Sequence, residues 1–445
     1  MSQWVSKMFA YHLRLALQSL RKSPILTALV VGLIALGVGM SMVTLTIHSA
    51  MSGDPIPAKS DVLFNVQIDS WSDENPWDED KPDAAPPQLT HIDAMAIREL
   101  PGVKRRAAMF KAVYTVVPDD PELKPFFAGA RMTDSDFFDM FQVPFVYGGG
   151  WSASVDQQAE RVVVLTHRIN EKFFGGENSV GKTIALGTER FKVVGVIDHW
   201  EPTPTFYDLN NGFFDDTQDV FLPFSMLQFG QLDRAGNTNC WGPGDNTKWE
   251  DFLLSTCNWI QLWVEFDSAS DVPAFQRELD AYANGQKELG RLPRDLNNPL
   301  MNVNDWLAHN EVVGEDNTVL VGLSFLFLAV CLFNAVGILL ARFQGKAGVI
   351  GVRRALGASK GAIFRQHLVE VAMIGVFGGL VGLALSWLGL YAVRKLMRGY
   401  EHLVHLDMSL VLTAVGIAVI SAVLAGLYPT WRVCQVTPAS YLKTQ

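Results

Sequence analysis

Four uninterrupted apolar runs constrain this chain more than any other feature of its sequence. They cover residues 25–47, 319–341, 371–393 and 408–431, and none of them contains a charged side chain. Each has about 23 residues, or about 34 Å as an α-helix, which matches a hydrocarbon core of roughly 30 Å. The sequence therefore predicts four transmembrane helices, one before and three after a long central segment. We place them at 25–50, 318–342, 367–393 and 408–431.

The distribution of charge predicts how these helices are oriented. Residues 1–24, 342–369 and 430–445 carry net charges of +4, +6 and +2, whereas residues 51–317 hold 21 basic and 43 acidic side chains. Cytoplasmic loops of membrane proteins are enriched in Lys and Arg. We therefore expect both termini in the cytoplasm and the large central segment outside the membrane, with a short outer loop at 394–407.

The N-terminal residues 1–24 mix aromatic and leucine side chains with cations and contain no acid. This pattern is typical of an amphipathic helix that lies on the inner membrane surface, and Pro24 would end it. The apolar run that follows is too long for the core of a cleaved signal peptide, so we interpret it as a retained span.

The central segment interleaves strand and helix patterns, which predicts a mixed α/β domain over 51–317. Strands are expected at 61–69, 109–117, 126–132, 161–166, 182–187, 190–197 and 259–266, and helices at 90–100, 135–141, 167–174 and 270–288. Residues 199–255 lack clear periodicity, and we interpret them as an insertion whose aromatic side chains either form small cores or line a binding surface. Residues 303–318 are expected to form an outer helix that continues into the second span.

The loop at 343–366 is strongly basic and contains a short amphipathic pattern. Val349, Ile350, Val352 and Leu356 recur at helical spacing and predict one apolar stripe. The residues from Gly357 to Ser359 supply a helix stop and a new N-cap. A helix of this kind on the cytoplasmic face fits either a positively charged topology signal or a docking element.

Two stretches carry a resemblance to a known family. IGVRRALGAS with FRQHLVE, and GLYPTWRVCQVTPASYL near the C-terminus, resemble the FtsX-like permease family of ABC transporters, in its MacB branch. Where many members have an acid before the Ile of IGVRRALG, this chain has Val349. The resemblance implies a cytoplasmic coupling helix that seats in an ATPase, and it assigns that contact to Gln344, Lys346, Val349, Ile350, Gly351, Val352, Arg353, Arg354, Leu356, Gly357, Ala358 and Ser359.

The resemblance also implies a membrane α-helical permease of the bacterial inner membrane, with four spans in a 1+3 arrangement and a periplasmic α/β domain. On this interpretation the chain has no ATPase domain of its own and no cofactor, and ATP and magnesium bind a separate ABC ATPase dimer. A second permease, a periplasmic adaptor, an outer-membrane exit duct and membrane lipid are the expected partners, and nucleic acid is not. The expected function is to relay ATPase motion to the periplasmic domain for export; lipoprotein release, or mechanical regulation of a cell-wall hydrolase or signalling partner, are the alternatives.

One motif points elsewhere, because residues 176–183 read GENSVGKT and satisfy the GxxxxGK[ST] pattern of a phosphate-binding loop. That loop requires a strand before it and a helix after it, so that backbone N–H groups and the helix N-terminus converge on phosphate. Here the sequence predicts a helix before and a strand after. We therefore expect this motif to bind no nucleotide, and we find no set of residues in the sequence that predicts a catalytic site.

The remaining candidates concern packing and covalent links. Cys240 and Cys257 could form a disulfide outside the membrane or remain free thiols. No spacing of His, Cys, Asp or Glu predicts a metal site; the aspartates between 208 and 219 lack the pattern of a calcium loop. Side chains expected to mediate packing or polar pairing between spans are Gly32, Asn334, Glu370, Gly375 and Gly379. Glu370 is expected to pair with Arg365 or another basic residue, or to extend to the membrane surface.

Overall fold

The computed structural model describes residues 14–118, 124–229, 234–242, 248–295, 297–396 and 408–435. The chain divides into a helical unit, formed by the residues up to Ser52 and from Val313 onward, and an α/β unit from Gly53 to Val312. Each unit is described by itself.

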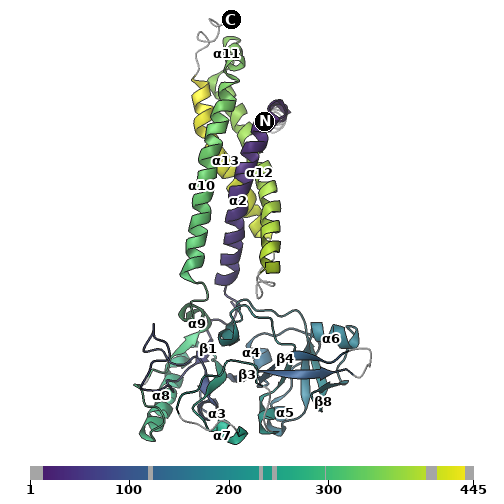
Figure 1. Ribbon diagram of the computed structural model, residues 1–445, viewed down its shortest axis with the longest axis vertical. Coiled ribbons are helices and arrows are strands. Elements are labelled where there is room, and N and C mark those ends of the chain that lie inside the picture. The colour runs from purple at the N-terminus through teal and green to yellow at the C-terminus, as the bar shows by residue number, and fades with distance from the viewer. Residues whose placement is uncertain are drawn as a thin grey trace. The chain divides into compact units, whose positions relative to one another are not determined.

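The helical unit is a bundle of four long helices that run side by side (Figure 1). They are α2 (Pro24–Ser52), α10 (Glu315–Gln344), α12 (Lys360–Leu396) and α13 (Met408–Cys434). In the described part of the chain these four are the helices long and apolar enough to cross a membrane. The fold predicted from the sequence, one span followed by three, is thus confirmed. Each helix extends beyond the run that predicted it, and α12 begins eleven residues before its run.

The segment before the first span is described only from residue 14. Residues 14–22 are helical, Ser23 interrupts the helix, and α2 begins at Pro24. The expected interfacial helix over 1–24 therefore lies partly outside the described residues. So do most of the expected outer loop at 394–407 and most of the tail at 432–445.

Glycines on α12 allow two neighbouring helices to approach it closely. A Cβ added at Gly375 would lie 2.7 Å from Ala422 Cβ of α13, and one added at Gly379 would lie 2.9 Å from Ala418 Cβ. On another face, a Cβ at Gly378 would meet Ile34 of α2 at 2.7 Å. No real Cβ tolerates such separations, so these positions require glycine if the helices are to keep this spacing.

Two of the residues expected to mediate contacts between spans do not do so within this chain. A Cβ at Gly32 would have no atom within 4 Å, so this glycine brings no described helix closer. Asn334 is exposed on the surface of α10 instead of bonding another helix of the bundle. Neither residue therefore packs against a helix of its own chain, because in a uniformly apolar span the sequence does not show which face is covered.

The α/β unit is built on one mixed sheet whose strands come from the whole length of this segment. The eleven strands in the described residues are β1 (Leu63–Val66), β2 (Leu89–Thr90), β3 (Arg105–Val117), β4 (Phe126–Thr133), β5 (Phe145–Gly148), β6 (Val162–Thr166), β7 (Thr183–Leu186), β8 (Glu189–Ile197), β9 (Val220–Pro223), β10 (Asn258–Glu265) and β11 (Leu300–Asn302). The main path runs β11-β1-β10-β3-β4-β9-β6-β8-β5, while β2 pairs with β10 and β7 pairs with β3 and β8. The pairs β4–β9 and β6–β8 are parallel, and the others are antiparallel.

Short helices cover the sheet. They are α3 (His91–Arg98), α4 (Phe137–Met140), α5 (Ala153–Gln158), α6 (His167–Phe174), α7 (Trp249–Leu253), α8 (Val272–Glu288) and α9 (Val303–His309), with 3-10 turns η1 (Phe206–Asn211), η2 (Phe224–Phe229) and η3 (Ala269–Asp271). Thr90 caps α3 as expected, because its hydroxyl accepts a hydrogen bond from the backbone N–H of Asp93 at 3.2 Å. Such a cap satisfies one of the free N–H groups of the first turn.

Strand β3 shows how the sheet separates two cores. Ala108 and Phe110 point into one cluster, which also contains Leu279 of α8, whereas Met109 points into a second cluster with Trp306 of α9. Side chains of a strand alternate between the two faces of its sheet, so both faces of β3 are covered. The mixed α/β domain predicted from the sequence is confirmed.

The segment 199–255 is not an insertion, contrary to the expectation. Its strand β9 lies in the sheet between β4 and β6, in parallel register with Ala130–Thr133 and antiparallel to Val164 and Leu165. A strand of four residues between turns is too short to show periodicity, which explains why the sequence did not reveal it. The first aromatic pair of the segment, Phe206 and Tyr207, is buried in the core.

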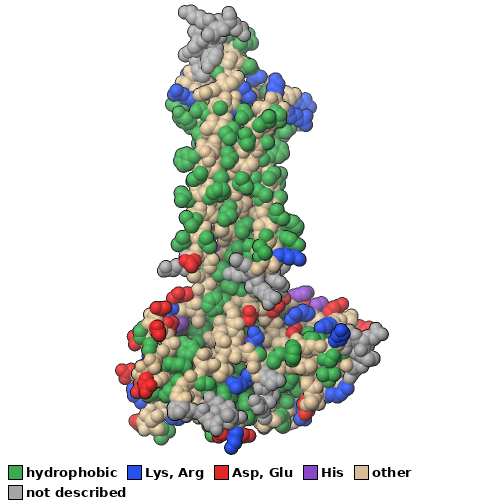
Figure 2. Space-filling view, viewed as in Figure 1, with side chains coloured by type: hydrophobic (Ala, Val, Ile, Leu, Met, Phe, Trp, Pro, Cys, Tyr) green, Lys and Arg blue, Asp and Glu red, His purple; other side chains and the backbone are tan. Residues whose placement is uncertain are grey.

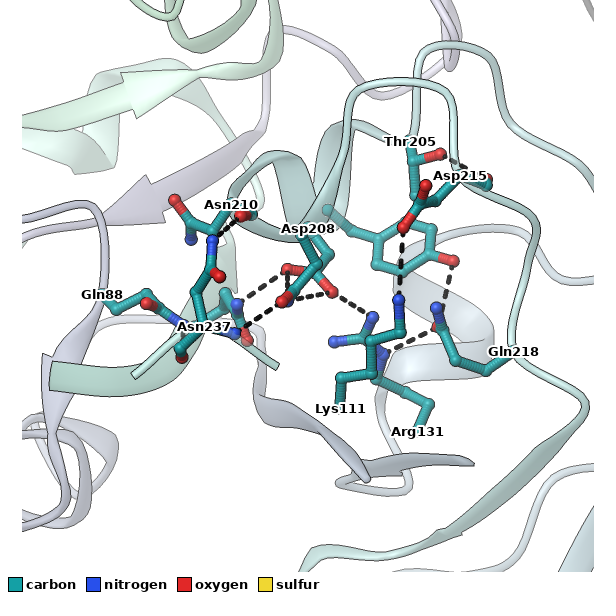
Figure 3. A network of polar contacts seen from close by, with 12 residues as sticks. Gln88, Lys111, Arg131, Thr205, Asp208, Asn210, Asp215, Gln218 and Asn237 are labelled. Carbon is teal, nitrogen blue, oxygen red and sulfur yellow. Dashed lines mark hydrogen bonds and ion pairs between the residues drawn. The ribbon is translucent and has the colours of Figure 1, made fainter. Parts of the chain in front are cut away.

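A fully buried charge pair anchors this segment to the sheet (Figure 3). Arg131 of β4 is 0% exposed, its guanidinium forms an ion pair with Asp208 of η1, and its Nε donates to Gln218 Oε1 at 3.0 Å. Gln261 of β10 donates to the other oxygen of Asp208 at 2.7 Å. The Arg131 guanidinium also lies 5.3 Å from the centre of the Tyr207 ring. The network therefore joins two strands to η1.

Two further features of this unit bear on the sequence predictions. Cys240 and Cys257 form a disulfide, which ties residues 234–242 to the start of β10. The outer helix α9 ends at His309 and α10 begins at Glu315, so no continuous helix runs into the second span. Glu311 has a φ of 52°, a left-handed conformation that breaks a right-handed helix.

Candidate functional site

The strongest candidate site lies at the end of the bundle that carries the basic loop. Figure 2 shows apolar side chains along the outside of the bundle and Lys and Arg side chains gathered at this end. Here α10 ends at Gln344, a short helix α11 (Ala347–Ala355) follows, and α12 begins at Lys360. The site therefore consists of α11 and the helix ends that hold it.

Helix α11 divides its apolar side chains between two faces. Ala347 and Ile350 are buried against the bundle. Val349, Val352 and Leu356 are exposed, and Leu356 is 83% exposed. The predicted stripe is therefore correct except for Ile350, which is buried in the apolar core of the bundle. The exposed three form an uncovered apolar face beside Arg353.

The turn after α11 has the geometry that its residues predict. Gly357 has a φ of 98°, which favours glycine, and the backbone N–H of Ala358 donates to the carbonyl of Arg353 at 3.0 Å. Ser359 Oγ then accepts from the backbone N–H of Ala362 at 3.2 Å and caps α12. This tight turn sets the angle between α11 and α12. Of the other expected contact residues, Gln344, Arg353, Gly357 and Ser359 are exposed, Lys346, Arg354 and Ala358 are partly exposed, and Gly351 is buried.

A buried ion cluster fixes the base of α11. The carboxylate of Glu370, on α12, is 1% exposed and lies 2.7 Å from an Arg342 nitrogen and 3.0 Å from Lys346 Nζ. Arg342 lies in the last turn of α10, and Lys346 directly precedes α11. Ser19 donates to Glu370 at 2.7 Å, and Lys346 also donates to Ser19 Oγ. One carboxylate thus joins three separate segments of the chain.

Arg342 extends the cluster to the first span. It donates to Thr27 Oγ1 at 3.0 Å and to the carbonyl of Ser19 at 3.2 Å. His367 lies one turn before Glu370, with its Nδ1 3.3 Å from a Glu370 oxygen and its ring against Phe343. The cluster therefore contains two cations for one anion, and a movement of Lys346 at the start of α11 would change its contacts with Ser19 and Glu370.

The sequence predicted part of this cluster. It singled out Glu370 and Lys346, but it did not select Arg342, Ser19 or His367, and it suggested Arg365 as a partner. Arg365 is exposed and belongs to no ion pair in the described residues. Charged side chains immediately beside apolar runs, such as Arg342 before the loop and Glu370 after it, were the available signal.

The motif at 176–183 lies in the other unit, between α6 and β7. A helix thus precedes it and a strand follows it, the reverse of the arrangement that binds phosphate. No group of three or more His, Cys, Asp or Glu side chains in the described residues is placed to hold a metal ion.

Comparison with known proteins gives two matches to family models. The model described as MacB-like periplasmic core domain matches residues 27–282, more than half of the chain. The model described as FtsX-like permease C-terminal matches residues 321–438. Together they include the first span, most of the α/β unit and all of α11.

Two individual relatives share less than a quarter of their residues with this chain over the aligned regions. A pyoverdine export ATP-binding/permease protein, PvdT of Pseudomonas aeruginosa, is 24% identical over 79% of this chain and 47% of its own length. A macrolide export ATP-binding/permease protein, MacB of Syntrophobacter fumaroxidans, is 22% identical over 80% of this chain and 52% of its own. The chain thus spans about half the length of these relatives.

Two solved structures match this chain with low TM-scores. The periplasmic region of MacB from Actinobacillus actinomycetemcomitans matches with a TM-score of 0.36 and 15% identity, covering 57% of this chain and 95% of that one. The extracellular domain of YknZ, from Gram-positive bacteria, matches with a TM-score of 0.34 and 16% identity, covering 54% of this chain and 100% of that one.

Proposed function

Because this chain belongs to the MacB branch of the FtsX-like permease family, we propose that it is the permease subunit of an ABC exporter in a bacterial inner membrane. ATP and magnesium bind the ATPase with which it works. The chain itself relays the motion of that ATPase to its extracytoplasmic domain, and substrate is handled outside the membrane. A periplasmic adaptor and an outer-membrane exit duct receive the substrate.

The uncovered apolar face of α11 is the observation that carries this proposal. Val349, Val352 and Leu356 project from a helix whose other side is already packed on the bundle. Apolar side chains next to arginines are typical of a surface that docks on a protein, because burial supplies affinity while charge supplies orientation. In the proposed complex the ATPase covers this face.

Movement of α11 reaches the spans through the buried ion cluster. A push on α11 displaces Lys346, and the carboxylate of Glu370 passes that displacement to Arg342 and to Ser19. The close contacts at Gly375 and Gly378 make α12 stiff against α13 and α2. In this mechanism the bundle moves as a set of coupled helices, and the α/β domain follows because both of its ends continue into spans.

Replacing Leu356 with aspartate tests the coupling surface. We expect ATP hydrolysis by the assembled permease and ATPase to fall about tenfold or more, because an exposed leucine that becomes buried in a complex is worth roughly 1.5–3 kcal/mol. The apparent melting temperature of the permease alone should not change, since Leu356 touches solvent in the free chain. ATPase assays and thermal unfolding in detergent measure the two quantities.

The matched control is Leu289→Asp, at the end of α8, where a leucine is 74% exposed in the other unit. It should leave ATP hydrolysis at the level of the unmodified protein. If Leu356→Asp and Leu289→Asp behaved alike, α11 would not be the docking surface.

The exposed face of α10 supports a second permease in the assembly. This face carries several exposed apolar side chains, which lipid could cover, but also Asn334 and Gly337. An amide in contact with hydrocarbon is unfavourable, and small residues one turn away allow a helix to approach. We place the contact with the second permease, identical or similar, on this face.

A Gly337→Phe variant tests that contact. A Cβ at Gly337 would meet no atom within 4 Å, so the single chain should fold normally. We expect the dimer fraction, measured by native mass spectrometry in mild detergent, to fall severalfold because the ring blocks close approach. Gly416→Phe on α13, where the added Cβ is equally unobstructed, is the control. An unchanged dimer fraction in Gly337→Phe would place the second permease elsewhere.

A further inference from the structure

An acid-lined cleft in the α/β unit is not used by the coupling mechanism. Its volume is about 520 Å³, within the range of roughly 300–1,000 Å³ that small-molecule sites occupy. Two segments form its walls: the stretch after β1, and the stretch between α8 and β11. The polar residues that line it are Asp69, Asp73, Asp83, Arg294, Asp295 and Asn297.

The two walls are bound to one another. Arg294 Nε donates to Asp69 Oδ2 at 3.0 Å, and another Arg294 nitrogen donates to the carbonyl of Pro82. Asn297 donates to the carbonyl of Asp83. These contacts fix the two walls of the cleft relative to one another and hold its acidic residues close together.

Negative charge in the cleft is not balanced by the protein. The one lining cation, Arg294, is already paired with Asp69. Asp295 has only a surface pair with Lys287 at 3.3 Å, and neither Asp73 nor Asp83 belongs to an ion pair in the described residues. Figure 2 shows acidic side chains gathered on this side of the α/β domain, where α8 lies.

The wall after β1 adds to this charge. Residues 69–83 contain seven acidic side chains and one basic, Lys81. Lys81 cannot neutralise the cleft, because its Nζ is 2.7 Å from Glu311 and donates to the carbonyl of His309.

Asp69 points independently to a missing partner. It is 1% exposed, and its Oδ1 accepts no hydrogen bond from the residues that the structure describes. Burial raises the pKa of this carboxyl above its usual range, although Arg294 and the backbone N–H of Trp71 oppose the shift. A buried acceptor without a donor costs roughly 1–3 kcal/mol. A cationic N–H donor bound in the cleft would remove that cost.

From these observations we propose that the cleft binds an organic cation that carries two or more ammonium groups. The carboxylates are spread along the walls, and no three of the acidic or histidine side chains in the described residues converge closely enough to hold a metal ion. A ligand whose ammonium groups are spaced apart can pair with carboxylates that are themselves spaced apart. The site is independent of the coupling surface on α11, since it lies in the other unit, and it can be tested without an ATPase.

Calorimetric titration of the full-length chain in nanodiscs with spermidine tests the proposal. We expect saturable binding with one spermidine per chain, and binding at least about tenfold weaker for choline, which offers one charge and no N–H donor. Trp71 and Trp77 belong to the stretch that forms the wall after β1, and their ring centres are 4.7 Å apart. Their fluorescence provides a second signal for the same titration.

The Asp73→Asn/Asp83→Asn double variant should weaken spermidine binding at least about tenfold. Both side chains are exposed, so the variant should fold, whereas a change at Asp69 would also break its pair with Arg294. Glu177→Gln, an exposed acid between α6 and β7, is the control and should bind normally. Absence of saturable binding, equal affinity for choline, or an unchanged affinity in the double variant would each overturn the proposal.

Discussion

Replacing Glu370 with glutamine is expected to destabilise the helical unit strongly and to uncouple it from ATP hydrolysis. The carboxylate is 1% exposed and faces Arg342 and Lys346 at 2.7 and 3.0 Å. Removing one partner of a buried ion pair costs about 3–5 kcal/mol, because the other partner stays buried without compensation. We expect the apparent melting temperature of the full-length chain in detergent to fall by several degrees, and ATP hydrolysis by the assembled complex to fall about tenfold or more.

Two comparisons separate this effect from a general loss of charge. Arg365→Gln removes an exposed charge from the same helix and should change the melting temperature little. Glu370→Gln combined with Arg342→Gln removes both members of the closest pair, and it should recover part of the stability lost in Glu370→Gln. If Arg365→Gln and Glu370→Gln had equal effects, the buried cluster would not be what holds α11.

The partner of Glu370 shows where prediction from sequence ends. Arg365 and Glu370 are five residues apart, which places them about 140° apart around a helix, so they cannot meet on one face. The actual partner, Arg342, comes from the end of the preceding span. Helical geometry alone excludes the nearer residue, but only the packing of α10 on α12 identifies the more distant one.

The fold likewise contains elements that a local sequence pattern predicts and elements that only tertiary contacts determine. The spans, α11 and the longer strands were predictable because each carries a strong local pattern: apolar length, helical spacing or alternation. Strand β9 was not, since four residues show no period and its place in the sheet depends on β4 and β6. The orientation of Ile350 toward the bundle likewise follows from tertiary contact, because its spacing matches the exposed stripe equally well.

Replacing Asp208 with alanine is the second change from which we expect a large effect. Asp208 is 2% exposed and is the carboxylate that faces Arg131, which is 0% exposed. Without it the Arg131 guanidinium remains buried without a counter-ion, at a cost of about 3–5 kcal/mol. Gln261 and Asn211 would lose their acceptor in the same step. The apparent melting temperature of the α/β unit, followed in the full-length chain, should fall on the order of 10 °C.

Asp215→Ala provides the contrast, because Asp215 pairs with Lys111 at 3.2 Å where both side chains are partly exposed. A surface pair of this kind contributes about 1 kcal/mol or less. If both variants lowered the melting temperature equally, burial of the Arg131 pair would not be what makes it important. The η1 turn that carries Asp208 also contacts α9. The Phe206 carbonyl of η1 accepts a 3.1 Å hydrogen bond from Trp306 of α9. Helix α9 is the last helix before the second span, so loosening η1 should reduce coupled ATP hydrolysis in Asp208→Ala and leave it unchanged in Asp215→Ala.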